Sequence, residues 1–335
     1  MQASRKAVGV WLLAIAVIIL AMVTIGGLTR ITGSGLSITE WDPIMGAIPP
    51  LTDAQWADAF AKYQKIPQYI LENRGMSLEA FKGIFWWEWT HRFLGRFVGV
   101  AFFVPFLWFA WKGAIRKSDW PRMLLLFVLG GLQGFIGWWM VQSGLETRVS
   151  VSQYRLAIHL GAALLLLIAI LWIALEYLRD LKSPPKPAGR AIGFVAVIYV
   201  QMLLGALVAG LHAGLIYNTW PDMDGRLFPE HPFFSAPWWI NFFENPGLAQ
   251  FDHRIGAYIV AGFAAWIFAA GVGLGGLAKK SAKLVATITT FQIGLGIATL
   301  LLQAPEGLAA LHQVTAAALL CAAVWHAYEL RHRAA

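Results

Sequence analysis

The chain has 335 residues, of which 58% are hydrophobic and only 13% are charged, and 17 of them are tryptophans. So low a share of charged residues excludes an ordinary soluble protein of this length. The formal net charge is +8, and its distribution along the chain decides what it means.

Eight apolar segments follow one another along the chain, each close to the roughly 20 residues that cross the hydrocarbon core of a bilayer. They lie at roughly 8–29, 91–111, 122–142, 156–178, 191–212, 254–276, 282–302 and 309–330. Backbone groups in lipid must hydrogen-bond within the protein, and single segments of this length do so as helices. We therefore predict an all-α polytopic membrane protein with eight transmembrane helices.

Basic residues are concentrated on one side of these predicted helices. The two termini and the loops near 112–122, 179–190 and 279–283 hold 15 Lys and Arg against 4 Asp and Glu, whereas the opposite side holds 11 against 14. The positive-inside rule then places both termini in the cytoplasm. The net charge reflects membrane topology, and we expect no nucleic-acid partner.

The chain contains an internal repeat. Residues 26–46, GGLTRITGSGLSITEWDPIMG, align without gaps to 205–225, GALVAGLHAGLIYNTWPDMDG, with six identities at an offset of 179. Further on, THRFLGRFVG at 90–99 matches DHRIGAYIVAG at 252–262, at an offset of 162. The third segment of each half also carries a glutamine followed four residues later by a glycine, Gln133 and Gly137 or Gln292 and Gly296.

The repeat predicts two halves with four helices each. An even number of spans per half gives both halves the same orientation, so the repeats are parallel. The N-terminal four-helix bundle covers 1–181 and the C-terminal one 191–335. The stretch between them, KSPPKPAGR at 182–190, contains three prolines and three basic residues, which is typical of a cytoplasmic linker.

Four of the eight histidines occupy matched positions at the outer starts of the even-numbered spans: His91, His159, His253 and His312. A single histidine at a membrane interface most often bonds a backbone carbonyl. Two pairs at equivalent positions favour ligation instead, because facing helices commonly build a cofactor site this way. The one cysteine, Cys321, lies inside the last span and offers no thiolate cluster. Two neutral imidazoles per half suit haem iron better than zinc, which takes about four ligands.

Two arginines follow predicted ligands directly, Arg92 after His91 and Arg254 after His253. At a helix mouth they would pair with haem propionates in charge-assisted hydrogen bonds. The alternative is that they extend to the lipid headgroups. Glycines near the histidines would let a flat macrocycle lie against the backbone, although ordinary close helix packing explains each of them equally well.

Glu88 distinguishes the two halves, because it aligns with Gln250 at the offset of 162. If the helix extends back this far, Glu88 and His91 lie on one face. A partly desolvated carboxylate there would move protons or stabilise positive charge. The alternative role is a first-turn residue that complements the helix dipole. The first outer loop, roughly 43–87, is the longer one and carries an amphipathic candidate, TDAQWADAFAKYQ, which either caps a pocket or lies passively on the surface.

Taken together, GGLTRITGSGLSITEWDPIMGAIPP, WWEWTHRFLGR, the Gln133–Gly137 stretch, FDHRIGAYIV and HQVTAA make the chain resemble the haem A synthase family over nearly its whole length. The similarity is to the longer form found in α-proteobacteria and mitochondria. It implies an eight-helix membrane oxidoreductase that oxidises a ring methyl of haem O to a formyl group, giving haem A for terminal oxidase assembly. Some members carry a cysteine pair in an outer loop, which this sequence lacks.

The resemblance also assigns roles to the histidines. It implies that His253 and His312 bind a resident haem b, and that His91 and His159 hold the substrate haem O, with Glu88 as the functional carboxylate. It implies the cell inner membrane, haem sites near the periplasmic side, and haem O synthase and terminal oxidase assembly factors as candidate partners besides membrane lipid. A homo-oligomer stays open.

The expected chemistry is two successive oxidations of the methyl group, through an alcohol and then a gem-diol that dehydrates to the aldehyde. The first alternative is a bis-His dihaem electron-transfer cytochrome, which predicts haems stacked across the bilayer rather than four ligands on one side. The second alternative is a transporter with parallel repeats. It would place polar groups near the midplane, where these spans are nearly bare of charge.

Overall fold

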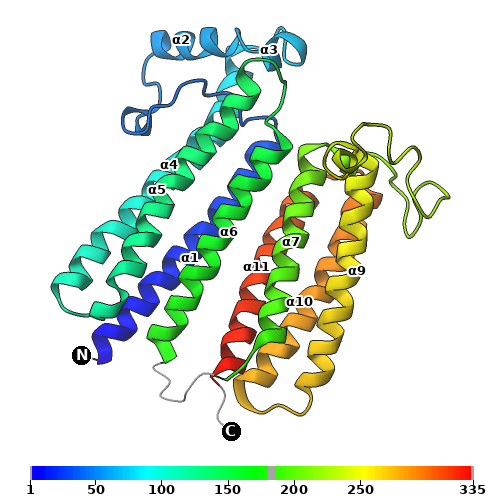
Figure 1. Ribbon diagram of the computed structural model, residues 1–335. Helices are drawn as coiled ribbons and strands as arrows, with labels where there is room; N and C mark the ends of the chain where they lie inside the picture. Colours follow the sequence, from blue (N-terminus) through cyan, green and yellow to red (C-terminus); the bar gives the residue numbers. More distant parts are fainter. Residues whose placement is uncertain (1, 180–185, 333–335) are drawn as a thin grey trace. The chain divides into compact units, whose positions relative to one another are not determined.

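The computed structural model describes residues 2–179 and 186–332. In this part of the chain eight helices are long and apolar enough to cross a membrane (Figure 1). They are α1 (Gln2–Ile31), α4 (Leu78–Trp111), α5 (Trp120–Leu145), α6 (Gln153–Arg179), α7 (Gly189–Gly210), α9 (Pro246–Gly271), α10 (Gly276–Leu301) and α11 (Glu306–Arg331).

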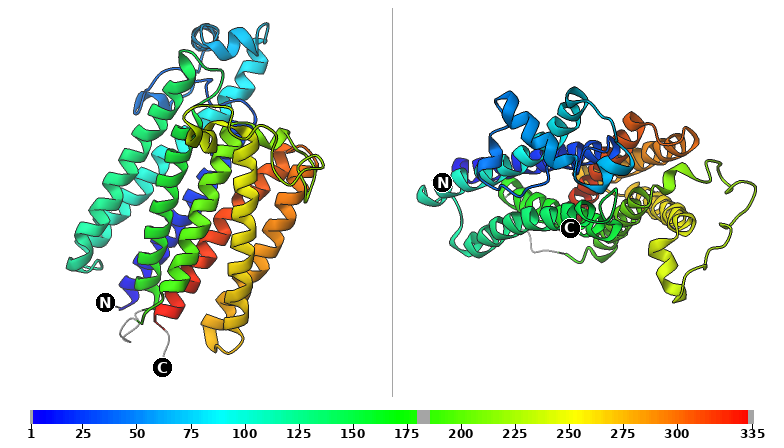
Figure 2. Two further views of the ribbon diagram at one scale, coloured as in Figure 1. Left: turned by 45° about the vertical axis from the view of Figure 1, so that its right-hand side comes forward. Right: turned by 90° about the horizontal axis from the view of Figure 1, so that it is seen from above.

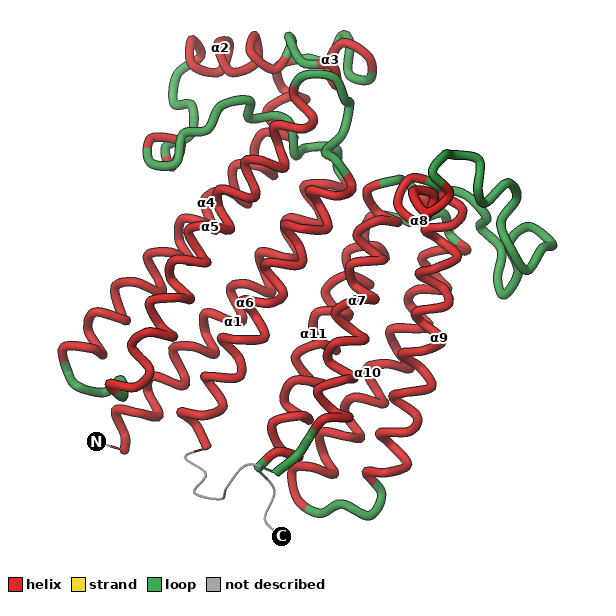
Figure 3. The backbone as a smooth tube through the Cα atoms, viewed as in Figure 1, coloured by secondary structure: helices red, strands yellow, loops and turns green. Residues whose placement is uncertain are grey.

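The other helical elements are short and lie in the connections. They are α2 (Asp53–Tyr63), α3 (Pro67–Leu71), α8 (Asn241–Glu244) and the 3₁₀ turns at Met45–Ala47, Lys117–Asp119, Ala213–Leu215 and Trp238–Ile240. The described residues form no β-strand, as the helix and loop colours of Figure 3 show. The prediction of an all-α membrane protein with eight spans is confirmed.

Several helices begin before the predicted spans: α1 at Gln2, α9 at Pro246 and α10 at Gly276, where the predicted starts are 8, 254 and 282. Helix α4 begins at Leu78, well before the predicted start at 91. Its first turns are amphipathic rather than apolar, so hydropathy did not include them in the span. Ser77 caps it by accepting a hydrogen bond from the Ala80 amide at 3.2 Å. Helix α9 ends at Gly271, before the predicted end at 276, since the turn 272–275 separates it from α10, whose first residue, Gly276, has φ +57°. The residues between the two helices are apolar, so the hydropathy pattern does not mark the end of the helix here.

One compact unit is formed by the described parts of Met1–Ala16 and Leu164–Ala335. In it α7, α9, α10 and α11 form a closed ring, in which α7 and α10 each contact both α9 and α11. Figure 2 shows these four helices side by side. Leu171 and Leu175 of α6 pack with Val324 and Tyr328 of α11 in a buried apolar cluster. Of the predicted linker 182–190, residues 182–185 lie outside the described residues.

The second compact unit, Val17–Ala163, contains the end of α1, the start of α6 and helices α2 to α5. Helices α2 and α3 lie at one end of α4 and α5, with α2 against α4 and α3 against α5 (Figure 1). The predicted halves 1–181 and 191–335 concern the sequence repeat and stay a prediction.

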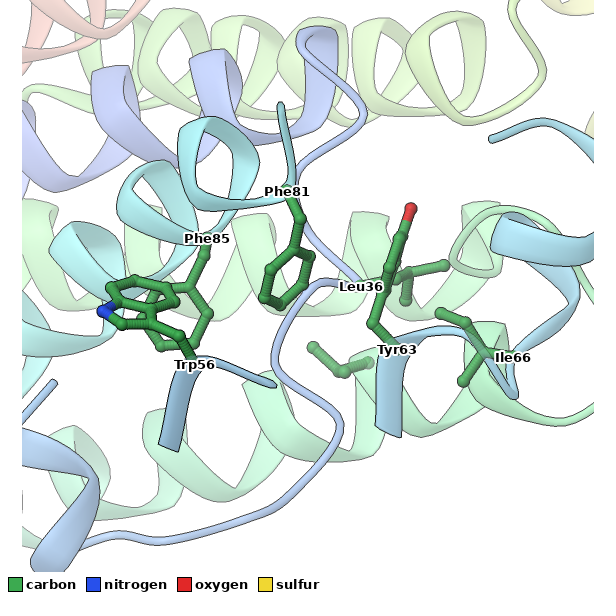
Figure 4. Close-up of a cluster of buried hydrophobic side chains, with 7 residues drawn as sticks. Leu36, Trp56, Tyr63, Ile66, Phe81 and Phe85 are labelled. Carbon is green, nitrogen blue, oxygen red and sulfur yellow. The ribbon is translucent and has the colours of Figure 1, made fainter. Parts of the chain in front are cut away.

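The predicted amphipathic segment in the first outer loop is a helix, α2. Thr52 and Gln55 form a capping box at its start. Its apolar face joins the buried cluster of Figure 4, which consists of Leu36, Trp56, Tyr63, Ile66, Phe81, Phe85 and Val141. Burial of one such large apolar side chain contributes about 1.5–3 kcal/mol. This aromatic packing fastens α2 to the first turns of α4, directly before Glu88.

Candidate functional site

His253 and His312 face each other inside the ring of α7, α9, α10 and α11. They belong to α9 and α11, and their ring centroids are 6.4 Å apart with the ring planes at 81°. An imidazole nitrogen bonds a metal at about 2 Å, so two imidazoles on opposite sides of one metal ion have centroids roughly 6 Å apart. The separation therefore fits two axial ligands of one iron.

A glutamine from the neighbouring helix contacts each of these histidines. The amide nitrogen of Gln201 on α7 lies 3.0 Å from His253 Nδ1 and donates to the His253 carbonyl at 2.8 Å. Gln292 on α10 contacts His312 at 3.0 Å through Nδ1 and donates to the His312 carbonyl at 2.9 Å. Each glutamine thus contacts its histidine ring at Nδ1, and the contact of Gln292 with His312 Nε2 is longer, at 3.5 Å.

A glycine one helical turn after each glutamine makes room for the imidazole. A Cβ built on Gly205 would lie 3.1 Å from His253 Cε1, and one on Gly296 would lie 2.9 Å from His312 Cε1. A side chain at either glycine would displace the ring. Gly256 makes similar room for the Gln201 amide. Gly137, Gly256 and Gly296 are among the glycines near the histidines, and each makes room for a histidine or glutamine side chain, as close helix packing would require.

The first half repeats this arrangement around His159. Gln133 on α5 lies 3.1 Å from His159 Nδ1 and donates to the His159 carbonyl at 2.7 Å. A Cβ built on Gly137 would lie 2.9 Å from His159 Cε1. His91, the predicted partner of His159, lies on α4. The predicted pairs therefore come from α4 and α6 in one half, and from α9 and α11 in the other.

His91 departs from the pattern. A Cβ built on Gly26 of α1 would lie 2.8 Å from His91 Cε1, so His91 also packs against a glycine, as the other three histidines do. Four residues earlier, however, α1 carries Met22 where α7 carries Gln201. The buried Nδ1 of His91 has no hydrogen-bond partner within the described chain.

Glu88 is buried in α4 with both carboxylate oxygens engaged. Its Oε2 accepts from Ser37 Oγ and from the Ile38 amide, each at 2.8 Å, and its Oε1 accepts from Arg92 Nε at 3.0 Å and Nη2 at 2.7 Å. Arg92 also donates to the carbonyls of Ile38 at 2.7 Å and Glu40 at 2.8 Å. Because α4 starts about three turns before Glu88, a first-turn role in complementing the helix dipole does not apply.

Gln250 and Arg254 hold the corresponding loop of the second half. The Gln250 amide donates to the carbonyls of Ala213 at 2.8 Å and Ile216 at 2.6 Å, and its oxygen accepts from Arg254 at 3.0 Å. Arg254 donates in addition to the carbonyl of Tyr217 at 2.8 Å. Both arginines of the sequence prediction are therefore tied to loop carbonyls, and their pairing with propionates stays a prediction.

The histidine pairs alone do not make a complete site for a bare metal ion. Across the described residues no group of three or more His, Cys, Asp or Glu side chains is placed to hold one. A metal ion between two imidazoles would need further ligands from a cofactor, as the four nitrogens of a porphyrin provide. The paired imidazoles, the glycine cradles and the partner glutamines fit such a group.

Residues 9–324 match a family model described as Cytochrome oxidase assembly protein (COX15-CtaA). The chain belongs to this family. The predicted resemblance to the haem A synthase family is confirmed by this match and by the following relatives. A heme A synthase of Parvibaculum lavamentivorans is 48% identical over 332 residues, 98% of this chain and 96% of the relative. Heme A synthases of Bradyrhizobium diazoefficiens and Azorhizobium caulinodans are each 49% identical and span 98% of this chain and 92% and 96% of their own.

Two contributors to the site escaped the sequence analysis. Gln201 was missed because only the third span of each half was compared, although its spacing to Gly205 equals that of Gln133 to Gly137. Ser37 was missed because its partner Glu88 lies far along the chain, and nothing in the local pattern marks it. The first signal was present in the repeat, whereas the second exists only in the fold.

Proposed function

We propose that this protein acts as a haem A synthase, an oxidoreductase that converts haem O to haem A in cytochrome oxidase assembly. The observation that carries this proposal is the facing pair His253 and His312, whose positions recur in the sequence of the first half as His91 and His159, in a chain similar along nearly its whole length to proteins named heme A synthase. The alternative of an electron-transfer cytochrome is not favoured, because those relatives carry the name of a synthase.

The second half, 191–335, holds a resident haem b through His253 and His312. The ring separation of 6.4 Å and the two partner glutamines support this assignment. Haem b supplies a one-electron carrier beside the substrate. The chain's own contribution is to hold both rings in fixed orientations inside a closed four-helix ring, which keeps this haem in place.

The first half, 1–181, takes haem O between His91 and His159. Only this half carries α2 and α3 beside its site, and only this half has a carboxylate at the position of Glu88. The substrate methyl is oxidised in two successive two-electron steps, each of which exchanges one hydrogen of the carbon for a hydroxyl group from water and releases two protons and two electrons to an external electron acceptor. The first step gives the alcohol and the second the gem-diol, which loses water to give the aldehyde. His91 and His159 would hold the porphyrin in place between the two steps, so that the same methyl group is oxidised twice.

Glu88 is the functional carboxylate of the first half and acts together with Arg92. A carboxylate offers about four lone-pair sites, and four hydrogen bonds already use them. A water molecule at Glu88 would therefore have to replace one of these donors. The direct contribution of Glu88 is to hold Arg92 and the segment 37–40, which lets the positive charge of Arg92 pair with a propionate of the substrate. In the second half the positive charge of Arg254 pairs in the same way with a propionate of haem b.

The protein lies in the cell inner membrane with both termini in the cytoplasm and its haem sites near the periplasmic side. The charge distribution of the loops supports this orientation. Haem O has to enter from haem O synthase or from the lipid, and haem A leaves toward the assembly factors of a terminal oxidase. A homo-oligomer is compatible with this scheme.

Pigment analysis of the purified full-length protein tests the proposal. We expect haem b together with haem O, the hydroxylated intermediate or haem A. A protein that contains only haem b, and that leaves added haem O unchanged under turnover conditions, would contradict the proposed activity and favour the cytochrome alternative.

A further inference from the structure

A four-residue pattern recurs in the helices that face the histidines. Helices α5, α7 and α10 each place a glutamine against an imidazole, followed one turn later by a glycine that makes room for the same ring. Helix α1 keeps the glycine, Gly26, but has Met22 in place of the glutamine. Three of the four imidazoles therefore have a side-chain partner on Nδ1, and His91 does not.

The chemistry of ligation explains why this partner matters. An imidazole that binds iron through Nε2 carries its proton on Nδ1, and a hydrogen bond from Nδ1 fixes both the tautomer and the ring plane. The acceptor for this proton is an amide oxygen. The Oε1 atoms of Gln133, Gln201 and Gln292 are buried and have no hydrogen-bond partner within the described chain.

A half-turn of each amide group exchanges its oxygen and nitrogen and brings the oxygen to Nδ1. Which atom occupies which position is an assignment based on the hydrogen-bond network, since the two are similar in shape. The half-turn gives up the bond to the histidine carbonyl, and the amide group also has to move away from it, because its oxygen would otherwise lie 2.7–2.9 Å from the carbonyl oxygen. In exchange, the Nδ1–H of an iron-bound imidazole gains the acceptor that its tautomer needs.

Resting on the proposed function, we propose that Gln133, Gln201 and Gln292 are positioning residues of the axial histidines. In the same proposal Met22, in the place of a fourth glutamine, makes His91 the weakly held ligand through which the substrate haem exchanges. The resident haem has two oriented ligands and stays bound. The substrate haem has one oriented ligand, His159, and one unoriented ligand, His91, so the product can leave.

Met22 lies where a glutamine would reach His91. Its Cε is 3.5 Å from a Cβ built on Gly95, one turn after His91 on α4, so its side chain packs against the ligand helix. Met and Gln are unbranched, similar in length and both compatible with a helix interior. The two residues can therefore be exchanged between the halves without a large change in shape.

The first experiment makes the second half resemble the first. In Gln201→Met we expect haem b to dissociate to an excess of apomyoglobin roughly tenfold faster or more, the usual scale for loss of a hydrogen bond to a ligand histidine. The electron paramagnetic resonance signal of the ferric low-spin haem should broaden or shift, because the ring plane is no longer fixed. Gln201→Glu keeps an acceptor oxygen and should restore slow dissociation.

The reciprocal experiment makes the first half resemble the second. In Met22→Gln we expect haem O or haem A to remain bound after purification in a larger share of molecules. Its transfer to apomyoglobin should slow by several-fold, and turnover should fall although the first oxidation proceeds. Met22→Leu, which adds no polar group, is the matched control and should behave as the unchanged protein does.

The outcomes separate this inference from the proposed function. Loss of haem b in His253→Ala, together with unchanged dissociation and resonance spectra in Gln201→Met, would overturn the positioning role alone. Retention of haem b in His253→Ala would overturn the ligand assignment itself. If Met22→Gln released its first-half haem as fast as Met22→Leu does, His91 would not be the exchangeable ligand.

Discussion

The loops that follow α1 and α7 are each held by two side chains, which we call the loop clamp: Glu88 and Arg92 in the first half, Gln250 and Arg254 in the second. The first residues of the two clamps have opposite hydrogen-bonding chemistry. In the first half the carboxylate of Glu88 faces two donors, the Ser37 hydroxyl and the Ile38 amide. In the second half the amide of Gln250 faces two acceptors, the carbonyls of Ala213 and Ile216. The residue at this position is therefore matched to the polar groups of its own loop.

The arginine one turn later is common to both clamps. Arg92 donates to the Ile38 carbonyl and Arg254 to the Tyr217 carbonyl, and these two acceptors align at the repeat offset of 179. The halves thus share a structural frame of histidine, glycine and arginine. They differ in the carboxylate, the partner of the first histidine and the helices beside the site.

Removal of the second-half histidines should have the largest effect on bound haem. We expect His253→Ala and His312→Ala to lose the resident low-spin haem and, with it, conversion of haem O. The reason is that one remaining imidazole cannot fix a bis-ligated iron. His231→Asn is the control, because His231 lies in a loop at φ +49°, a conformation that asparagine tolerates. A haem b content equal to that of the control would contradict the assignment.

Removal of the first-half histidines should leave the resident haem untouched. In His91→Ala and His159→Ala we expect conversion of haem O to fall by at least tenfold, about 1.4 kcal/mol or more in the free energy of activation. The absorbance of haem b should stay normal, since its proposed ligands lie in the other half. Parallel assays of haem content and product formation check this. Equal loss of haem b in these variants would show that the halves do not divide the two roles.

Exchange of Glu88 and Gln250, the first residues of the two clamps, should have a smaller effect than loss of a histidine. The effect should appear in both halves. Glu88→Gln replaces one carboxylate oxygen with an NH2 group, which faces either the Ser37 and Ile38 donors or the Arg92 guanidinium and leaves a donor without its acceptor, at a cost of about 1–3 kcal/mol. We expect lower conversion of haem O. Gln250→Glu turns carboxylate oxygens toward the Ala213 and Ile216 carbonyls, and it should lower the thermal stability of bound haem b by a similar amount. Full conversion of haem O by Glu88→Gln, with normal haem content, would refute the role of this carboxylate.

The smallest expected effect concerns the helices that only the first half carries beside its site. The Tyr63 hydroxyl donates to Gln68 at 3.0 Å and accepts from Asn73 at 2.7 Å, and burial raises its pKa. The folded state therefore favours the neutral phenol, and α2 and α3 should lose stability as the pH rises above about 10. Tyr63→Phe should cost about 1 kcal/mol at neutral pH and abolish this alkaline loss.

Limited proteolysis of residues 43–77 at neutral and alkaline pH measures that difference. Tyr69→Phe serves as the control, because Tyr69 lies in the same region and its side chain is only partly buried. If the unchanged protein and Tyr63→Phe gained protease sensitivity equally with pH, the buried phenol would not be the cause.

Hydropathy was enough to predict the eight spans, since each carries a long apolar run. It could not predict that α4 begins at Leu78, because Glu79, Lys82 and Glu88 lie in its first turns and hide the helix from an apolar count. The repeat led to all four histidines. The loop clamps escaped it because their partners, such as Ser37 for Glu88, meet only when the loop folds back onto the helix.

The measurement closest to the central claim is a pigment analysis of the double variant His91→Ala/His159→Ala beside His253→Ala/His312→Ala. The first protein should retain haem b and contain neither the hydroxylated intermediate nor haem A. The second should lack the resident haem b and its low-spin spectrum. Haem A in the first protein, or normal haem b in the second, would contradict the division into a substrate half and a resident-haem half.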